Sequence, residues 1–296
     1  MVYTTKNSLH ILGIHGISQN PDTKDYIIVL QYIQGGNFNN WMNENFKSFN
    51  WKNKLMALSN IISGLKEIHQ KRMIHRDFHT GNILVKRADH QVISDMGLCG
   101  KVGNMDKTKI YGVMPYVAPE VLKGKPYNQA ADIYSLGMIM YFIATGRQPF
   151  DNCAHDKYLA LNICNEVRPE ISEPEAPKCY IDLMKKCWDP NPDNRPNTTK
   201  IQNSVRLFRY SYIYDASDFE KYMLIKKEQQ HYEIENQFKE AEEYRKANLL
   251  SNENNHLTTH PQAIYTSRLL NPFTEDLPKE HDNIDNSSVE ITDFTK

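Results

Sequence analysis

The side chains most suited to chemistry lie in the segment MIHRDFHTGNIL, residues 73–84, where acidic, basic and amide groups stand between two apolar pairs. Transfer of a phosphoryl group needs a carboxylate that holds the acceptor hydroxyl and oxygen ligands that hold a metal ion. Asp77 can supply the carboxylate, and Asn82 can supply a ligand. Asp95 follows in ISDMGLCG, between a short apolar run and a glycine, and can supply a second ligand. Hard oxygen ligands from separate loops suit Mg²⁺, so the pattern predicts metal-assisted phosphoryl transfer.

Apolar patterns predict the elements that must position these groups. The run YIIVLQYI, residues 26–33, ends at two glycines and is typical of a buried strand, and HILGIHGI, residues 10–17, indicates a second, shorter strand. From Trp51 onward the spacing predicts an amphipathic helix with a buried face made of Leu55, Leu58, Ile62, Leu65 and Ile68. Beyond Asp132 the pattern is helical to about Tyr212, with breaks at proline clusters. A small strand-rich start therefore precedes a mostly helical body.

Composition narrows the classes of partner. Thirty-five basic and thirty-six acidic side chains give a net charge of -1, so we expect no binding to nucleic acid or to an anionic membrane. The longest apolar run, YSLGMIMYFIAT at 134–145, is about half the ~20 residues that a membrane span needs, and it predicts a buried core helix. The five cysteines are scattered and never spaced as CxxC, which favours a reducing cytoplasm.

The C-terminal third has a different composition. Residues 217–250 are rich in Glu, Lys and Gln and predict a solvated helix, and the polar chain from Ser251 onward predicts disorder. The stretch AIYTSRLLNPF, residues 263–273, is the one part of this tail with enough apolar content to dock on a surface. Such a segment more often caps its own domain than binds a partner.

Five motifs in order make the chain resemble the C-terminal lobe of a eukaryotic protein kinase, closest in character to the tyrosine-kinase-like group. HRDFHTGN resembles the catalytic loop, and DMG at 95–97 stands where DFG is expected. YVAPE, which ends at Glu120, resembles the APE motif. ADIYSLG at 131–137 and CWDPNPDNRP at 187–196 resemble the start of the central helix and the late Trp and Arg motif. The resemblance covers roughly residues 8–210.

The resemblance implies an α+β fold of the protein-kinase type, with a truncated N-lobe of two strands and the hinge on a mostly helical C-lobe. We place the residual N-lobe strands and hinge at residues 1–34 and the C-lobe at 35–212. A charged helical extension follows at 213–250, and a largely disordered tail at 251–296.

The resemblance also implies roles for the motif residues. Asp77 would be the catalytic base, and Asn82 and Asp95 would hold Mg²⁺. Arg76 would pair with a phosphorylated activation segment, in which Thr108 and Tyr111 are candidate acceptors of that phosphate.

For the nucleotide, the resemblance implies a gatekeeper and hinge that touch adenine, formed by Leu30, Gln31 and Ile33, with Leu84 beneath the base. Simple core packing explains the apolar members of this set equally well. Glu120, Asp132 and Arg195 are scaffold residues in the resemblance, because the Glu pairs with the Arg and the Asp caps backbone amides.

Several departures bear on activity. His79 stands where serine/threonine kinases usually carry Lys, and Val113 stands where they usually have Thr, so the accepted residue type stays open. The sequence contains no GxGxxG before the hinge and no VAIK-like lysine, and its first glutamate is Glu44. Loss of the groups that hold the phosphates removes several kcal/mol of transition-state stabilisation, and each ~1.4 kcal/mol is a tenfold change in rate, so we expect slow phosphoryl transfer. We also expect the sequence to be a truncated form of a longer kinase.

Two functions follow from these observations. The first is a protein kinase that uses ATP and Mg²⁺ to phosphorylate a Ser, Thr or Tyr hydroxyl of a protein substrate. The alternative is a catalytically impaired pseudokinase that binds a protein partner through its helical lobe and tail. A small-molecule phosphotransferase shares the HxDxxxxN loop, but the APE motif and Arg195 argue against it.

Overall fold

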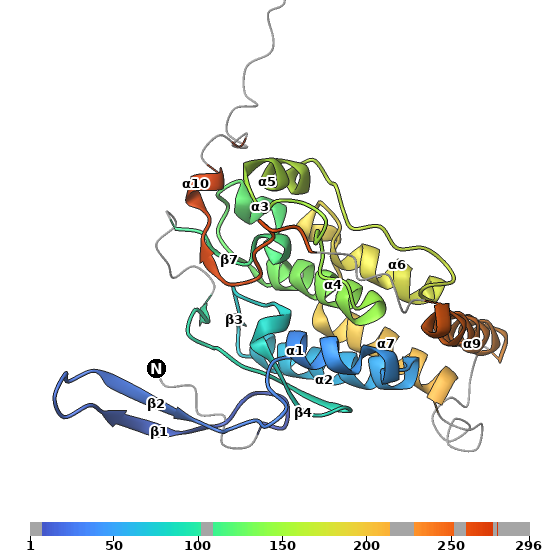
Figure 1. Cartoon of the computed structure of the whole chain (residues 1–296), viewed down its shortest axis with the longest axis horizontal. Coiled ribbons are helices and arrows are strands. Elements are labelled where there is room, and N and C mark those ends of the chain that lie inside the picture. The colour runs from blue at the N-terminus through green and yellow to red at the C-terminus, as the bar shows by residue number, and fades with distance from the viewer. Residues whose placement is uncertain (1–7, 102–108, 214–227, 252–258, 275–276, 278–296) are drawn as a thin grey trace, which may run out of the picture.

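A computed structural model describes residues 8–101, 109–213, 228–251, 259–274 and 277 (Figure 1). A small strand-containing part adjoins a larger helical body, which confirms the predicted α+β architecture. The helices are α1 (Phe38–Asn45), α2 (Trp51–Gln70), α3 (Pro119–Leu122), α4 (Gln129–Thr145), α5 (Lys157–Cys164), α6 (Lys178–Cys187), α7 (Thr198–Ile213), α9 (Glu228–Ser251) and α10 (Asn271–Thr274). Short 3-10 helices are η1 (Phe46–Ser48), η2 (Thr80–Asn82), η3 (Met114–Tyr116) and η4 (Pro192–Asn194).

The described strands form antiparallel pairs. The pairs are β1 (Ile14–Gln19) with β2 (Tyr26–Leu30), β3 (Met73–Ile74) with β6 (Gly100–Lys101), β4 (Ile83–Arg87) with β5 (His90–Ile93), and β7 (Tyr111–Gly112) with β8 (Arg268–Leu269). The β3, β4 and β6 strands frame the loop that carries the predicted catalytic residues, so their short ladders fix where that loop begins and ends.

Helix α4 is the centre of the core. Every residue from Ala131 to Thr145 is buried, which confirms the predicted core helix. Asn128 caps its start by accepting from the Ala131 N–H, and Gly146 ends it at φ 72°, a left-handed conformation that glycine adopts without strain. Among the described residues, none of the helices combines the length and the apolar character that crossing a bilayer requires.

Helix α2 packs beside α7 and α4. The face predicted from its spacing is confirmed, because Leu55, Leu58, Ile62, Leu65 and Ile68 are all fully buried. Asn50 caps the helix by accepting from the Asn53 N–H at 2.9 Å. The helix therefore begins where the sequence pattern changes period.

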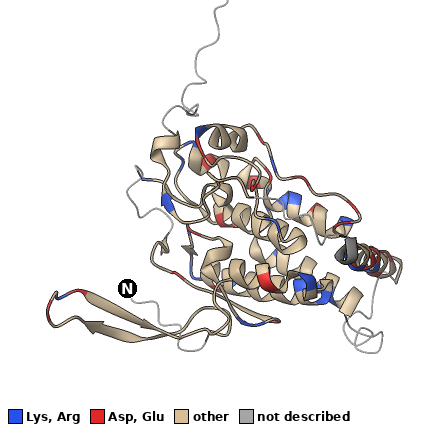
Figure 2. Cartoon of the chain, in the orientation of Figure 1, with Lys and Arg blue, Asp and Glu red and all other residues tan. Residues whose placement is uncertain are grey.

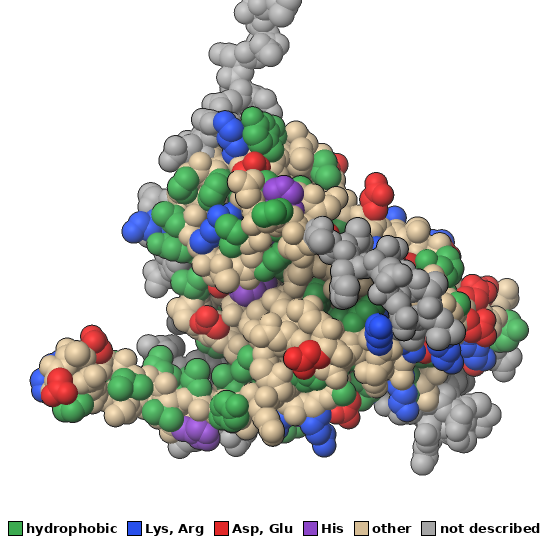
Figure 3. Space-filling view, viewed as in Figure 1, with side chains coloured by type: hydrophobic (Ala, Val, Ile, Leu, Met, Phe, Trp, Pro, Cys, Tyr) green, Lys and Arg blue, Asp and Glu red, His purple; other side chains and the backbone are tan. Residues whose placement is uncertain are grey.

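The strand predicted to be buried is exposed. The β1–β2 hairpin extends away from the body, and all five residues of β2 are between 44% and 77% exposed (Figures 1 and 3). The strand itself forms because its β-branched and aromatic residues favour extended backbone. Burial fails because a two-stranded ribbon has no layer of its own to cover it, and among the described elements β2 packs chiefly on β1. The first strand is also shifted along the chain from the predicted 10–17 to Ile14–Gln19.

Helix α9 is less solvated than its composition predicted. It carries both acidic and basic residues (Figure 2), yet Ile234, Phe238 and Ala241 are buried against the body. The Phe238 ring lies 5.6 Å from the Trp51 ring, measured between centroids. The Glu242 carboxylate accepts from the Trp51 N–H at 3.0 Å, so α9 satisfies a donor at the start of α2.

The predicted disordered tail contains an ordered segment. Residues 259–274 return to the body, where β8 and α10 lie beside β7 (Figure 1). Burial of Leu270 and of Thr274 stabilises the docked segment, although its polar composition predicted disorder. The acidic end at residues 278–296 lies outside the described residues.

Candidate active site

The loop between β3 and β4 is anchored to α4. Asp132, in the first turn of α4, accepts from the backbone N–H groups of His75 at 2.8 Å and Arg76 at 3.0 Å. It also accepts from the ring of His69 at 2.8 Å. Arg76 has a φ of 71°, which is strained for a residue other than glycine, and the buried Asp132 carboxylate holds that strained backbone in place. The predicted capping role of Asp132 is confirmed.

Asp77 is buried and contacted from two sides. Asn82 Nδ2 donates to the backbone oxygen of Asp77 at 2.9 Å and lies 3.4 Å from Oδ2. His79 Nε2 lies 3.6 Å from Oδ1. Since the Gly81 N–H donates to His79 Nδ1, the neutral imidazole carries its proton on Nε2, the nitrogen that is near Asp77. His79, which the sequence left without a role, therefore orients the predicted base.

The charge of Asp77 is set by these neighbours. Burial by itself raises the pKa of Asp77, but the contacts of His79 and Ser267 with its carboxylate hold its pKa below the ordinary value. Asp77 Oδ1 makes no hydrogen bond of good geometry with any described residue. Catalytic hydrogen bonds are often long or poorly aligned before substrate binds.

Asn82 and Asp95 belong to neighbouring segments that are tied together by Ser94. The Ser94 N–H and hydroxyl both donate to the backbone oxygen of Asn82, at 2.8 and 3.0 Å. Asp95 is exposed, has a φ of 52°, and accepts from the Gly97 N–H at 3.2 Å. Met96 packs against the main core, as expected for the residue in place of the DFG phenylalanine.

Two hard oxygen ligands can be presented to a metal ion here. The amide nitrogen of Asn82 is committed to Asp77, so its oxygen is the ligand that it can offer. Asp95 offers an exposed carboxylate. Mg²⁺ takes one or two protein oxygens and completes its shell with water and phosphate oxygens, so this pair fits that ion.

The residues predicted to touch adenine are only partly brought together. Ile33 is buried in a small apolar cluster with Leu12 and Val92, and Leu84 packs against that cluster. Leu30 lies outside it on the exposed β2 strand, with 46% of its surface accessible. The Gln31 N–H donates to the Gly13 oxygen at 2.9 Å, so that backbone donor is already used.

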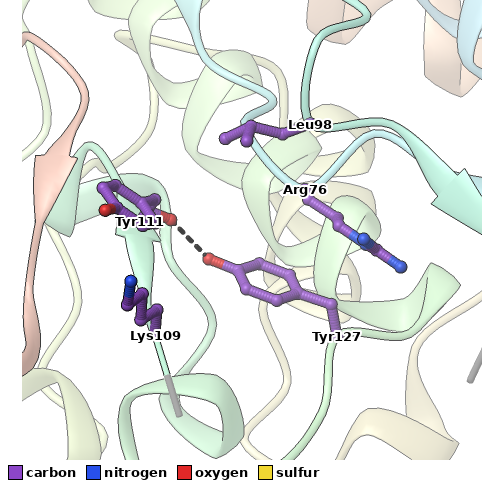
Figure 4. Close-up of a pocket in the computed structure, with 5 residues that line it drawn as sticks. All are labelled: Arg76, Leu98, Lys109, Tyr111 and Tyr127. Atoms are coloured by element: carbon purple, nitrogen blue, oxygen red, sulfur yellow. Dashed lines mark hydrogen bonds between the residues drawn. The ribbon is translucent and has the colours of Figure 1, made fainter. Parts of the chain in front are cut away.

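Arg76 lines a small cavity with Leu98, Lys109, Tyr111 and Tyr127 (Figure 4). The Tyr127 hydroxyl donates to the Tyr111 backbone oxygen at 2.6 Å and closes one side. The cavity has room for about one water molecule, so the phosphate-pairing role of Arg76 stays a prediction. Tyr111 is at the cavity, whereas Thr108 lies outside the described residues.

The scaffold pair predicted at Glu120 and Arg195 is present. Arg195 Nη1 and Nη2 donate to the two Glu120 oxygens at 2.7 and 2.8 Å, in the bidentate geometry that guanidinium and carboxylate favour. Arg195 also donates to the backbone oxygen of Ala130 at 2.9 Å. The pair therefore links α3 to the start of α4, below the catalytic loop.

Comparison with known proteins finds protein kinases. The family model of protein tyrosine and serine/threonine kinases matches residues 1–205. A protein kinase C delta type homolog of Drosophila melanogaster is 36% identical over 162 residues, which cover 53% of this chain and 24% of that protein. The dual serine/threonine and tyrosine protein kinase of Strongylocentrotus purpuratus is 29% identical over 157 residues, which cover 52% and 16%. Human receptor-interacting serine/threonine-protein kinase 1 is 27% identical over 212 residues, which cover 64% and 31%, so the chain spans less than a third of each relative.

Proposed function

Because the chain belongs to the protein tyrosine and serine/threonine kinase family, we propose that it transfers the γ-phosphate of ATP to a hydroxyl group of a protein substrate. One observation carries the proposal: the Asp77 carboxylate is ionised, buried and oriented by Asn82 and His79, while its Oδ1 keeps capacity to accept a hydroxyl proton. A purely structural carboxylate would have this capacity satisfied.

In this proposal each residue has one task. Asp77 holds the acceptor hydroxyl and takes its proton. Asn82 and Asp95 would hold Mg²⁺, which neutralises charge on the phosphate oxygens when it is bound. His79 keeps the Asp77 carboxylate in place, and Arg76 pairs with a phosphorylated activation segment.

The nucleotide base would lie against Ile33 and Leu84, beside Leu30 and Gln31. The exposed apolar side chains of β2 support a further part of the proposal. Uncovered apolar strands invite association with other strands, so the working kinase would pack additional N-lobe strands on this hairpin. All five cysteines are free, which supports a cytoplasmic location.

The alternative is a pseudokinase that acts as a protein-binding module. The ordered tail segment would then be part of a binding surface for a protein partner.

The test is phosphoryl transfer by the full chain. The chain is incubated with labelled ATP, Mg²⁺ and mixed acidic and basic acceptor proteins, and we expect Asp77→Asn to reduce labelling by roughly 100-fold or more. Asp89→Asn is the matched control, because Asp89 is an exposed aspartate whose only ion pair is with the exposed Arg87 among the described residues. Equal labelling by the wild type and by Asp77→Asn would reject the proposal. Nucleotide binding without any transfer would favour the pseudokinase.

A further inference from the structure

The ordered tail segment, residues 259–274, lies on the part of the body that surrounds Asp77. Strand β8 pairs antiparallel with β7, in the register Tyr111 with Leu269 and Gly112 with Arg268. The Leu270 N–H donates to the Ile110 oxygen at 2.8 Å, and the Ile110 N–H donates to the Asn271 side chain at 2.8 Å. The tail thus adds a strand to the edge of the chain just before the YVAPE motif (Figure 1).

A second set of contacts holds the other end of the segment. The His155 N–H donates to the Gln262 oxygen at 3.1 Å, and the His260 N–H donates to the Asp151 oxygen at 2.8 Å. The Tyr265 hydroxyl donates to the Pro149 oxygen at 3.0 Å, and its ring meets the His155 ring edge to face at 4.8 Å. Two anchored ends define the path of the residues between them.

That path brings Ser267 to Asp77. A Cβ atom placed on Gly112 would lie 3.7 Å from Asp77 Oδ1, so β7 runs directly past the carboxylate. Arg268 is the register partner of Gly112, and Ser267 is its neighbour in the chain. The Ser267 side chain is near enough to Asp77 to help hold the pKa of that carboxyl below its ordinary value, and Ser267 itself is exposed.

We propose that residues 259–274 occupy the acceptor-peptide groove as an intramolecular substrate and that Ser267 is the hydroxyl that is phosphorylated. The inference rests on the proposed kinase function, and it adds that the groove accepts an aliphatic hydroxyl in an extended peptide. Binding by strand addition is a general way in which proteins hold extended peptides. The buried Leu270 anchors the peptide three residues after the acceptor site.

The chemical step is a simple transfer. Ser267 Oγ attacks the γ-phosphorus of ATP, and an oxygen–phosphorus bond forms while the bond from that phosphorus to the β,γ-bridging oxygen breaks. The hydroxyl proton passes to Asp77, and ADP leaves. The new phosphate carries about -1.5 to -2 charges beside the Asp77 carboxylate, so repulsion releases the segment from the groove.

The first test measures occupancy without any need for activity. Hydrogen–deuterium exchange of the full chain is compared with that of Leu270→Asp, and we expect the amides of Ile110 and Leu270 to exchange roughly tenfold or more faster in the variant. Leu269→Asp is the matched control, because Leu269 is 38% exposed and the same change is made one residue away. Asn271→Ala removes the partner of Ile110 without a buried charge, and it tests the contact if Leu270→Asp unfolds. Unchanged exchange in both Leu270→Asp and Asn271→Ala would overturn the docking.

The second test maps phosphate on the full chain after incubation with ATP and Mg²⁺. We expect Ser267 to be labelled at a rate independent of protein concentration, with loss in Ser267→Ala and no change in the control Thr266→Ala. The tethered segment competes for the groove at an effective concentration of ~1 mM, so it largely excludes an added serine peptide at ~0.1 mM. Leu270→Asp releases the segment, and we therefore expect this variant to label the added peptide roughly tenfold faster than the wild type does.

The outcomes separate the two proposals. Labelling of the added peptide without labelling of Ser267 would overturn this inference and leave the kinase function intact. No labelling of any acceptor would overturn the kinase function and the acceptor role of Ser267 together.

Discussion

Removal of the Asp132 carboxylate should cost a large share of the stability of the protein. Asp132→Ala leaves the backbone N–H groups of His75 and Arg76 without an acceptor in a buried site, and it also strands His69 Nε2. Each buried donor that loses its partner costs about 1–3 kcal/mol, so the two amides together cost about 2–6 kcal/mol. A value near ~4 kcal/mol is comparable with the whole stability of a marginal domain, which is about 5–15 kcal/mol.

The assay is urea unfolding followed by circular dichroism, with Asp132→Asn as an intermediate. The asparagine keeps one oxygen acceptor, and we expect it to lose about half as much free energy of unfolding as the alanine. Asp182→Ala is the control, because Asp182 is half exposed and pairs with Lys178 within one helix, and such surface pairs contribute little to stability. A loss below ~1 kcal/mol in Asp132→Ala would refute the reasoning that this carboxylate holds the catalytic loop.

Two further predictions concern pH. Burial lowers the pKa of Lys54 from 10.5 to about 7, so between these values the unfolded chain binds a proton that the folded chain does not, and stability rises with pH. Urea titrations at about pH 7 and about pH 8.5 should show that the free energy of unfolding of the wild type rises by about 1.4 kcal/mol per pH unit. We expect no such rise in Lys54→Met, and equal slopes in the two proteins would contradict the prediction. His79→Leu removes a contact that lowers the pKa of Asp77, so the acid limb of the pH–rate profile should move to higher pH, and an unmoved limb would exclude His79 as a positioning residue.

The catalytic loop was predictable from sequence because its contacts are set by short, dense motifs. The residues Asp77 and Asn82 are close in the chain, so their contact needs only the local turn at η2. The apolar face of α2 and the long apolar run of α4 also predicted burial directly, since each helix packs along its whole length. These features depend on the spacing of residues along the chain, which can be read directly from the sequence.

The exposure of the β1–β2 hairpin could not be predicted from residue spacing. The residues of β2 favour a strand, and the strand forms, but burial requires a second layer that propensity cannot supply. For the same reason α9 was misjudged: its buried stripe of Ile234, Phe238 and Ala241 is short, and its partners near Trp51 lie far away in the chain.

The position of Ser267 depends on contacts that are still more distant in the chain. It follows from the register of two-residue strands, and a shift of one residue would turn Ser267 away and bring Arg268 toward Asp77. The sequence offers no signal for that register, because AIYTSRLLNPF shows only that some surface can bury its apolar residues. The burial of Leu270 in the main core stabilises the register in which Gly112 lies opposite Arg268. A single apolar anchor thereby helps to select which hydroxyl reaches the base.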